Sequence, residues 1–204
     1  YYVASCYYHY SAKLTAQAAE VLGKTEDAKA YGKLADEVRE AIRKEYFTAT
    51  GRLAVDTQTA HVLALWFDIV TDENRSRIIA DLKKLLDAAD GHLRAGFVGT
   101  AYLSQTLSKY GLNDYAYKLL LNEHYPSWLY EVNMGATPVW ERWNSVLPNG
   151  LVSDTGMNSM NHYAYGAVEE WVYRYVCGLN PASDGAGFKK AVIHPMPGKG
   201  LGFA

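Results

Sequence analysis

A single carboxylate, Glu141, stands between Trp140 and Trp143 in a short aromatic segment. Sugar-cleaving sites use these residue types, because aromatic rings line a pocket and a positioned carboxylate acts as general base. Thr137 is a good N-cap and Pro138 suits the first helical position, so we expect Glu141 in the opening turn of a helix. The helix dipole favours an ionised carboxylate there. The alternative is an ordinary first-turn glutamate paired with the arginine that follows it.

Other polar side chains join Glu141 as candidates. His162 is predicted in the first turn of a final helix over residues 158–177, on the same side as Asn158. Asn158, with its polar neighbours, gives that helix end a patch that could contact a ligand, although Asn158 could equally be a cap. We therefore predict Glu141 as the catalytic residue and His162, Asn158, Trp140 and Trp143 as substrate-binding residues. Glu131 is a second carboxylate, which we expect in a solvated loop.

The sequence contains no motif typical of a metal site or a cofactor site. The six histidines do not have the spacing of metal ligands, and two distant cysteines, Cys6 and Cys177, make no metal motif. Both are expected as free thiols within helices. A Gly-rich phosphate loop and a nucleophile elbow are also missing from the sequence. We expect neither a metal nor a cofactor.

Composition limits the function classes. The chain has 204 residues, of which 49% are hydrophobic, enough for one sizeable core. Its net charge is −2 with mixed signs and no basic stripe, so we expect neither nucleic acid nor a membrane surface as partner. The sequence starts at Tyr1 already in helical register, and we expect it to be a piece of a longer protein. Its cellular compartment stays open.

The pattern of apolar residues predicts helix after helix, joined by short turns. The ranges are 4–22, 25–46, 58–67, 72–89, 99–110, 113–122 and 158–177. Helices with few charges, such as 58–67, alternate with amphipathic ones, such as 25–46. Two concentric rings would produce this alternation, because inner helices are covered on all sides and outer helices face solvent. The fold class is therefore all-α, a partial toroid of helical hairpins.

The end of the chain has a different character. Residues 180–187 are rich in small and turn-forming residues and are expected to be a linker. Residues 188–194 are expected to form a strand, and one strand cannot form a domain. We expect 1–180 to be the C-terminal portion of a helical barrel domain. Residues 181–204 would then be a linker and the first strand of a following β-domain.

Five segments together are characteristic of a known family. They are DTQTA at 56–60, GFVGT at 96–100, YPSW at 125–128, GAT at 135–137 with WERW at 140–143, and MNSMNHYAYG at 157–166. Across nearly its whole length the chain resembles the bacterial α-L-rhamnosidases of glycoside hydrolase family 78. The resemblance implies an (α/α)6 barrel followed by a β-sandwich, and inverting hydrolysis of terminal α-L-rhamnosides. It also implies that Glu141 is the general base and that His162 contacts the sugar.

The resemblance also implies what the chain lacks. The family's general acid lies on a segment that would precede Tyr1, and about seven of the twelve helices of a closed barrel are present. In an inverting pair the two carboxyl groups lie roughly 6.5–9.5 Å apart. We therefore expect the chain alone to be inactive. We also expect self-association through the uncovered apolar flanks of a half barrel.

Two other functions compete with this one. A glucoamylase-like or trehalase-like hydrolase would share the barrel and its aromatic cleft. A tetratricopeptide-like scaffold would use hairpins such as that of residues 18–46, although the pattern would have to recur about every 34 residues and does not.

Overall fold

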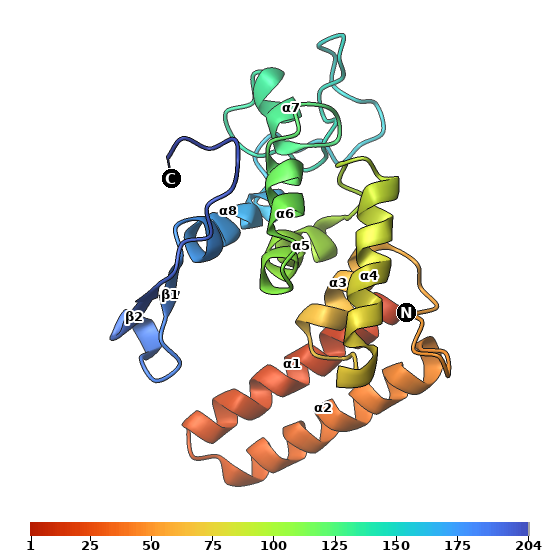
Figure 1. Ribbon diagram of the computed structural model, residues 1–204, viewed down its shortest axis with the longest axis vertical. Coiled ribbons are helices and arrows are strands. Elements are labelled where there is room, and N and C mark those ends of the chain that lie inside the picture. Colours follow the sequence, from red (N-terminus) through yellow and green to blue (C-terminus); the bar gives the residue numbers. More distant parts are fainter. Residues whose placement is uncertain (204) are drawn as a thin grey trace. The chain divides into compact units, whose positions relative to one another are not determined.

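The computed structural model describes residues 1–203 and is mostly helical (Figure 1). It divides into two compact units, one ending at Leu85 and the other starting at Leu86. The helices that begin in the first unit are α1 (Tyr2–Val21), α2 (Thr25–Tyr46), α3 (Gln58–Trp66) and α4 (Asp72–Ala88). The all-α fold class predicted from the periodicity is confirmed, and within residues 1–203 no helix is long and apolar enough to cross a bilayer.

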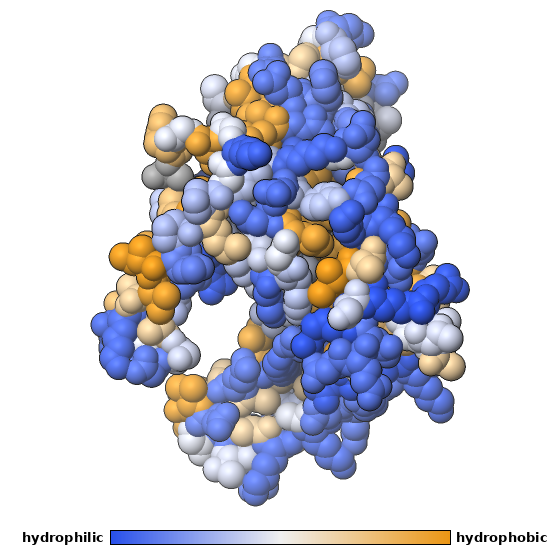
Figure 2. Space-filling view, in the orientation of Figure 1, coloured by the Kyte–Doolittle hydropathy of each residue, from blue (hydrophilic) through white to orange (hydrophobic). Residues whose placement is uncertain are grey.

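The helices α1 and α2 form an antiparallel hairpin around Gly23, whose φ of +68° suits the predicted left-handed cap. Helix α2 has the predicted bounds. Acidic residues in its first turn and basic residues in its last turn complement the helix dipole. Hydrophilic residues cover most of the outward side of α2 in Figure 2, as expected for an outer helix.

Helix α3 is buried almost all round, which confirms the prediction made from its lack of charge. Its N-cap is Thr57, whose hydroxyl accepts the Ala60 N–H at 3.1 Å. The buried ring of His9 on α1 lies 2.8 Å from the Ala35 carbonyl and 3.1 Å from the Phe67 carbonyl. One side chain thus links α1 to α2 and to the residue that ends α3.

The second unit packs around Trp171, which is fully buried. The Trp171 Nε1–H donates to the Ser108 hydroxyl at 2.7 Å, and the ring meets Tyr117 edge-on. The elements of this unit are α5 (Phe97–Lys109), α6 (Asn113–Leu120), α7 (Trp128–Asn133), the 3₁₀ turn η1 (Ala164–Ala167), α8 (Val168–Trp171), the π turn η2 (Val172–Val176), β1 (Leu179–Pro181), the 3₁₀ turn η3 (Ala186–Phe188) and β2 (Ala191–Ile193).

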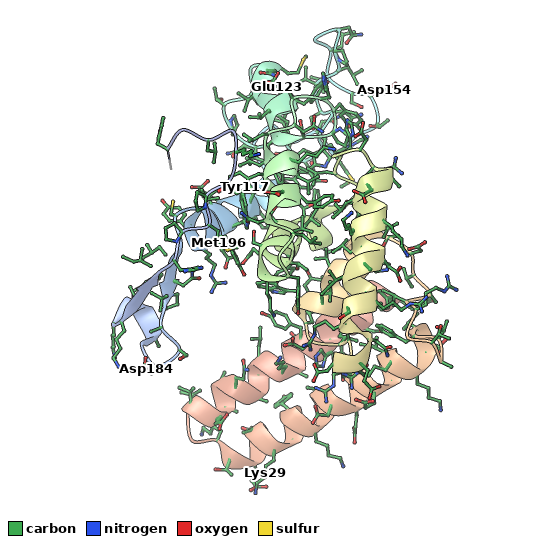
Figure 3. The ribbon with its side chains drawn as sticks, viewed as in Figure 1. Lys29, Tyr117, Glu123, Asp154, Asp184 and Met196 are labelled. Carbon is green, nitrogen blue, oxygen red and sulfur yellow. The ribbon has the colours of Figure 1, made fainter. Side chains whose placement is uncertain are left out.

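The predicted strand at 188–194 is shorter in the structure and has a partner. Strand β2 pairs antiparallel with β1, with Leu179 opposite Ile193 and Pro181 opposite Ala191. Strand β1 lies where a linker was expected, so the predicted boundary between residues 180 and 181 runs through it. After β2 the chain returns to α6, where the Tyr117 hydroxyl donates to the Met196 carbonyl at 2.9 Å (Figure 3).

Candidate active site

The segment that carries Glu141 is not helical, so the predicted helix start at Thr137 and Pro138 is wrong. Helix α7 ends before it, at Asn133, and Gly135, whose φ is +88°, follows the C-cap residue Met134. The backbone of this segment then bonds across to residues 159–162 instead of to its own next turn. The Glu141 N–H donates to the Ser159 carbonyl at 2.9 Å, and the N–H of His162 donates to the carbonyl before Trp140 at 2.8 Å. These bonds satisfy the groups that a helix would have used.

This pairing brings together two predicted site residues that are distant in sequence, Glu141 and His162. The half-buried Glu141 carboxylate accepts the Ser159 N–H at 3.0 Å. A backbone N–H on a carboxylate is a charge-assisted bond, so it fixes the direction of the side chain. The Arg142 guanidinium turns to Thr155 and to the Gly156 carbonyl, the latter at 3.3 Å, rather than serving as the partner suggested by sequence proximity.

His162 precedes the first helical turn, η1, rather than lying inside it, because residues 158–163 are irregular. Its ring is stacked between Phe97, at 5.0 Å, and Tyr163, at 5.4 Å between centroids. The His162 Nδ1 accepts the Ala164 N–H at 3.2 Å. In the neutral ring the proton is therefore on Nε2, which can donate to a hydroxyl group.

Asn158 is not a helix cap, so the alternative role suggested for it from the sequence is wrong. Its side-chain NH₂ donates to the Ser153 carbonyl, and its Oδ1 is buried without a hydrogen-bond partner in the part of the chain that the structure describes. The half-buried amide therefore braces the segment that precedes His162. Contact with a substrate stays a prediction for Asn158.

The two tryptophans beside Glu141 are buried, Trp140 being 3% exposed and Trp143 being 8% exposed. Trp143 stacks on Tyr165 with centroids 3.8 Å apart and meets Trp128 edge-on at 5.2 Å. In this structure Trp143 therefore belongs to a buried aromatic group with Trp128 and Tyr165. Direct contact between a sugar and either ring stays a prediction.

Between Trp143 and Asn158 the chain makes a separate excursion. An isolated antiparallel bridge joins Val146 to Val152. The Ser153 N–H donates to the Ser145 carbonyl at 2.9 Å and closes the base of the excursion. Its tip, residues 148–151, is exposed. The excursion therefore holds itself together without the backbone bonds that join Glu141 to Ser159.

Glu131 was wrongly predicted to be solvated, because the short helix α7 was not recognised. It is 3% exposed, and its Oε2 accepts the Trp140 N–H at 3.2 Å. Burial raises the pKa of Glu131 from 4.5 to about 7, and the Trp140 hydrogen bond opposes that rise only in part. Ser127, a strong N-cap residue followed by Trp128 and then by Glu131, was the sequence signal that could have revealed the helix.

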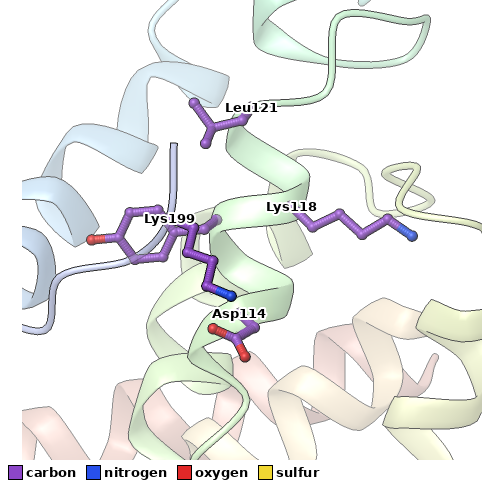
Figure 4. Close-up of a pocket in the computed structure, with 5 residues that line it drawn as sticks. Asp114, Lys118, Leu121 and Lys199 are labelled. Atoms are coloured by element: carbon purple, nitrogen blue, oxygen red, sulfur yellow. The ribbon is translucent and has the colours of Figure 1, made fainter. Parts of the chain in front are cut away.

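Other features of this unit lie apart from these residues. A pocket of about 290 Å³ is lined by Asp114, Tyr117 and Lys118 of α6, by Leu121, which follows α6, and by Lys199 (Figure 4). None of its lining residues belongs to the predicted site. Across residues 1–203 no three His, Cys, Asp or Glu side chains are grouped to hold a metal ion, and Cys6 and Cys177 are free thiols.

Comparison with known proteins gives consistent results. Residues 1–176 match the family model of the bacterial alpha-L-rhamnosidase 6 hairpin glycosidase domain. An alpha-L-rhamnosidase of Formosa agariphila is 44% identical over 197 residues, covering 96% of this chain and 21% of the relative. One of Streptomyces avermitilis is 41% identical over 196 residues, covering 96% of this chain and 19% of the relative. The chain thus spans about a fifth of the length of the curated relatives it matches.

Solved structures agree with the sequence relatives. The Streptomyces avermitilis alpha-L-rhamnosidase complexed with L-rhamnose has a TM-score of 0.88 at 41% identity, covering 95% of this chain and 18% of that chain. The native enzyme from Aspergillus terreus also has a TM-score of 0.88, at 36% identity, covering 93% and 22%. The helical hairpins expected from the alternation of charged and uncharged helices are therefore those of a known glycosidase domain. The chain belongs to the family of the bacterial α-L-rhamnosidase six-hairpin glycosidase domain.

Proposed function

We propose that this chain supplies the general base of an α-L-rhamnosidase and that Glu141 is that base. The observation that carries the proposal is the hydrogen bond from the Ser159 N–H to the Glu141 carboxylate. The same backbone pairing fixes His162, so that a carboxylate and a ring N–H donor are held by one local structure. Family membership supports this assignment, and the L-rhamnose complex of the Streptomyces relative supports the choice of sugar.

In this mechanism a water molecule loses a proton to Glu141 as its oxygen attacks the anomeric carbon of a terminal α-L-rhamnoside. The glycosidic bond breaks on the opposite face, and a general acid gives a proton to the leaving oxygen. The product has inverted configuration. His162 Nε2–H would donate to a sugar hydroxyl, and Asn158, Trp140 and Trp143 would complete the binding site.

Glu131 is not suited to be the general acid. A pKa of about 7 is what such an acid requires. However, its carboxyl is 3% exposed and its Oε2 is already bonded to the Trp140 N–H. An acid must lie within hydrogen-bond reach of the leaving oxygen. We therefore assign the acid to a segment outside this chain and expect the chain alone to be inactive.

The decisive experiment replaces Glu141 with glutamine in the longest natural polypeptide that contains this sequence. We expect kcat on an aryl α-L-rhamnoside to fall by about 10²–10⁴, while calorimetry shows that L-rhamnose still binds. Glu123→Gln, at an exposed position (Figure 3), is the matched control and should leave kcat unchanged. NMR of the first-formed sugar checks for inversion. Near-normal turnover by Glu141→Gln would remove Glu141 from the mechanism, and cleavage of α-glucosides alone would indicate a glucoamylase-like enzyme.

We also propose that the isolated chain self-associates. Large apolar side chains on α1, including Tyr8, Leu14 and Val21, are exposed. Covering them would remove apolar area from water. Light scattering on the purified chain should show a mass that rises with concentration, and a constant monomer mass would contradict this proposal.

A further inference from the structure

Helix α7 contacts both of the segments that carry the candidate site residues. Trp128 and Glu131 are spaced i, i+3 and therefore lie on one face of the helix. From this face, the Trp128 Nε1–H donates to the Tyr165 carbonyl at 2.9 Å. Glu131 Oε2 accepts the Trp140 N–H at 3.2 Å. One helix face thus bonds to the chain just before Glu141 and to the chain just after His162.

The helix itself is well fixed. The buried Ser127 hydroxyl caps α7 by accepting the Tyr130 N–H at 3.0 Å. At the other end the Ala136 N–H donates to the Glu131 carbonyl at 3.0 Å and closes the last turn. The stacked rings of Trp143 and Tyr165 fill the space beside Trp128. Because α7 is fixed at both ends, it can hold the Trp140 N–H and the Tyr165 carbonyl in defined positions.

The hydrogen bond between Glu131 and Trp140 is shielded from solvent. Glu131 is 3% exposed and Trp140 is 3% exposed, so little water can replace the carboxyl as a partner for the Trp140 N–H. The amide nitrogen of Trp140 is one residue before Glu141. Loss of this acceptor would leave a buried N–H unpaired, a cost that is relieved only if the backbone moves.

We propose that Glu131 is a positioning residue for the general base: through the Trp140 N–H it fixes the backbone that directs the Glu141 carboxylate toward the substrate. This inference rests on the proposed function. Glu131 touches neither substrate nor water in this role and acts only through Glu141.

The protonation state of Glu131 gives this role a distinctive pH dependence. With a pKa of about 7, the carboxyl is neutral in mildly acidic solution, and Oε2 can accept from Trp140 while Oε1 carries the proton. Three titratable or charged groups belong to the surroundings of Glu131: Tyr165 interacts with Glu131 itself, and Tyr125 and the Arg142 guanidinium interact with Tyr165. Burial raises the pKa of Tyr165 further above its usual value, so this group stays neutral near pH 7. Ionisation of Glu131 therefore places a new buried charge behind the base.

Two substitutions separate positioning from simple stability, both made in the longest natural polypeptide that contains this sequence. Glu131→Gln keeps an oxygen acceptor for Trp140 and cannot ionise. Its kcat in mildly acidic solution should match the wild type, and its rate should fall less steeply above about pH 7. Glu131→Leu removes the acceptor. Its kcat should fall by about a hundredfold, as expected for a small displacement of a reacting group, with little change in KM.

The controls make each failure readable. Glu123→Gln repeats the carboxyl-to-amide change at an exposed position and should alter neither kcat nor the pH profile. Circular dichroism shows whether the Glu131→Leu protein has folded. If it has not, the pH–rate profile of Glu131→Gln alone tests the positioning role. An inactive wild type refutes the proposed function. If the wild type is active, two results would overturn the positioning role alone. One is a decline of rate above about pH 7 that is the same in Glu131→Gln as in the wild type. The other is a folded Glu131→Leu protein with normal kcat.

Discussion

The stability of this chain should fall with rising pH because of Glu131. Its carboxyl has a pKa of 4.5 when unfolded and about 7 when folded. Below pH 4.5 both states are protonated and the burial of Glu131 has its full stabilising value. Between these two pKa values the unfolded state binds fewer protons than the folded state, so the free energy of unfolding decreases. Above the folded pKa both states are ionised and the loss is complete.

The size of the effect follows from the shift. One pKa unit corresponds to about 1.4 kcal/mol. Between about pH 5 and about pH 8 the wild type should therefore lose about 2–3 kcal/mol relative to Glu131→Gln, which cannot ionise. Comparing the two proteins at each pH cancels the other carboxylates, because both proteins contain them.

Urea unfolding followed by tryptophan fluorescence measures this difference, since Trp128, Trp140 and Trp143 surround the site. Glu123→Gln should run parallel to the wild type at every pH, because that side chain is exposed. Parallel curves for wild type and Glu131→Gln would refute the reasoning. They would mean that the Glu131 carboxyl is hydrated, and the bond to Trp140 would then lose its importance.

Two further predictions concern the second unit. Trp171→Phe should cost about 1–3 kcal/mol in urea unfolding, because the buried Ser108 hydroxyl loses the Trp171 Nε1–H donor and keeps only its own bond to Asn113 Oδ1. Gly178→Ala should lower the melting temperature far more than Gly156→Ala. Both glycines have positive φ, at +73° and +75°, but a Cβ on Gly178 would also overlap the His194 backbone, whereas none lies near Gly156. Equal melting temperatures would contradict the steric argument.

Sequence patterns predicted two kinds of helix: those with a clear apolar face opposite a charged face, and those that are buried on every side. Helix α2 was predicted with its observed bounds, because its apolar residues recur at helical spacing and a charged face lies opposite them. Helix α3 was recognised as an inner helix because it has no charged residue on any face. In both cases the signal is contained within the segment itself.

The site could be predicted only in part, because its geometry depends on pairing between distant segments. Thr137 and Pro138 favour a helix start locally, but backbone bonds from Glu141 to Ser159 give the chain another partner. No periodicity within either segment reports that bond. Glu131 was placed in water because the single helical turn around it is too short to show a repeating apolar stripe.

The self-contained excursion between Trp143 and Asn158 has a consequence for how relatives can diverge. Because the Val146–Val152 bridge and the Ser145–Ser153 bond close the excursion where it begins and ends, its tip can be lengthened or exchanged with little effect on the spacing of Glu141 and His162. Sequence changes at the tip would leave the backbone pairing between Glu141 and Ser159 intact. Variation in this protein family should therefore concentrate at positions 148–151, while the two paired stretches stay constant in length.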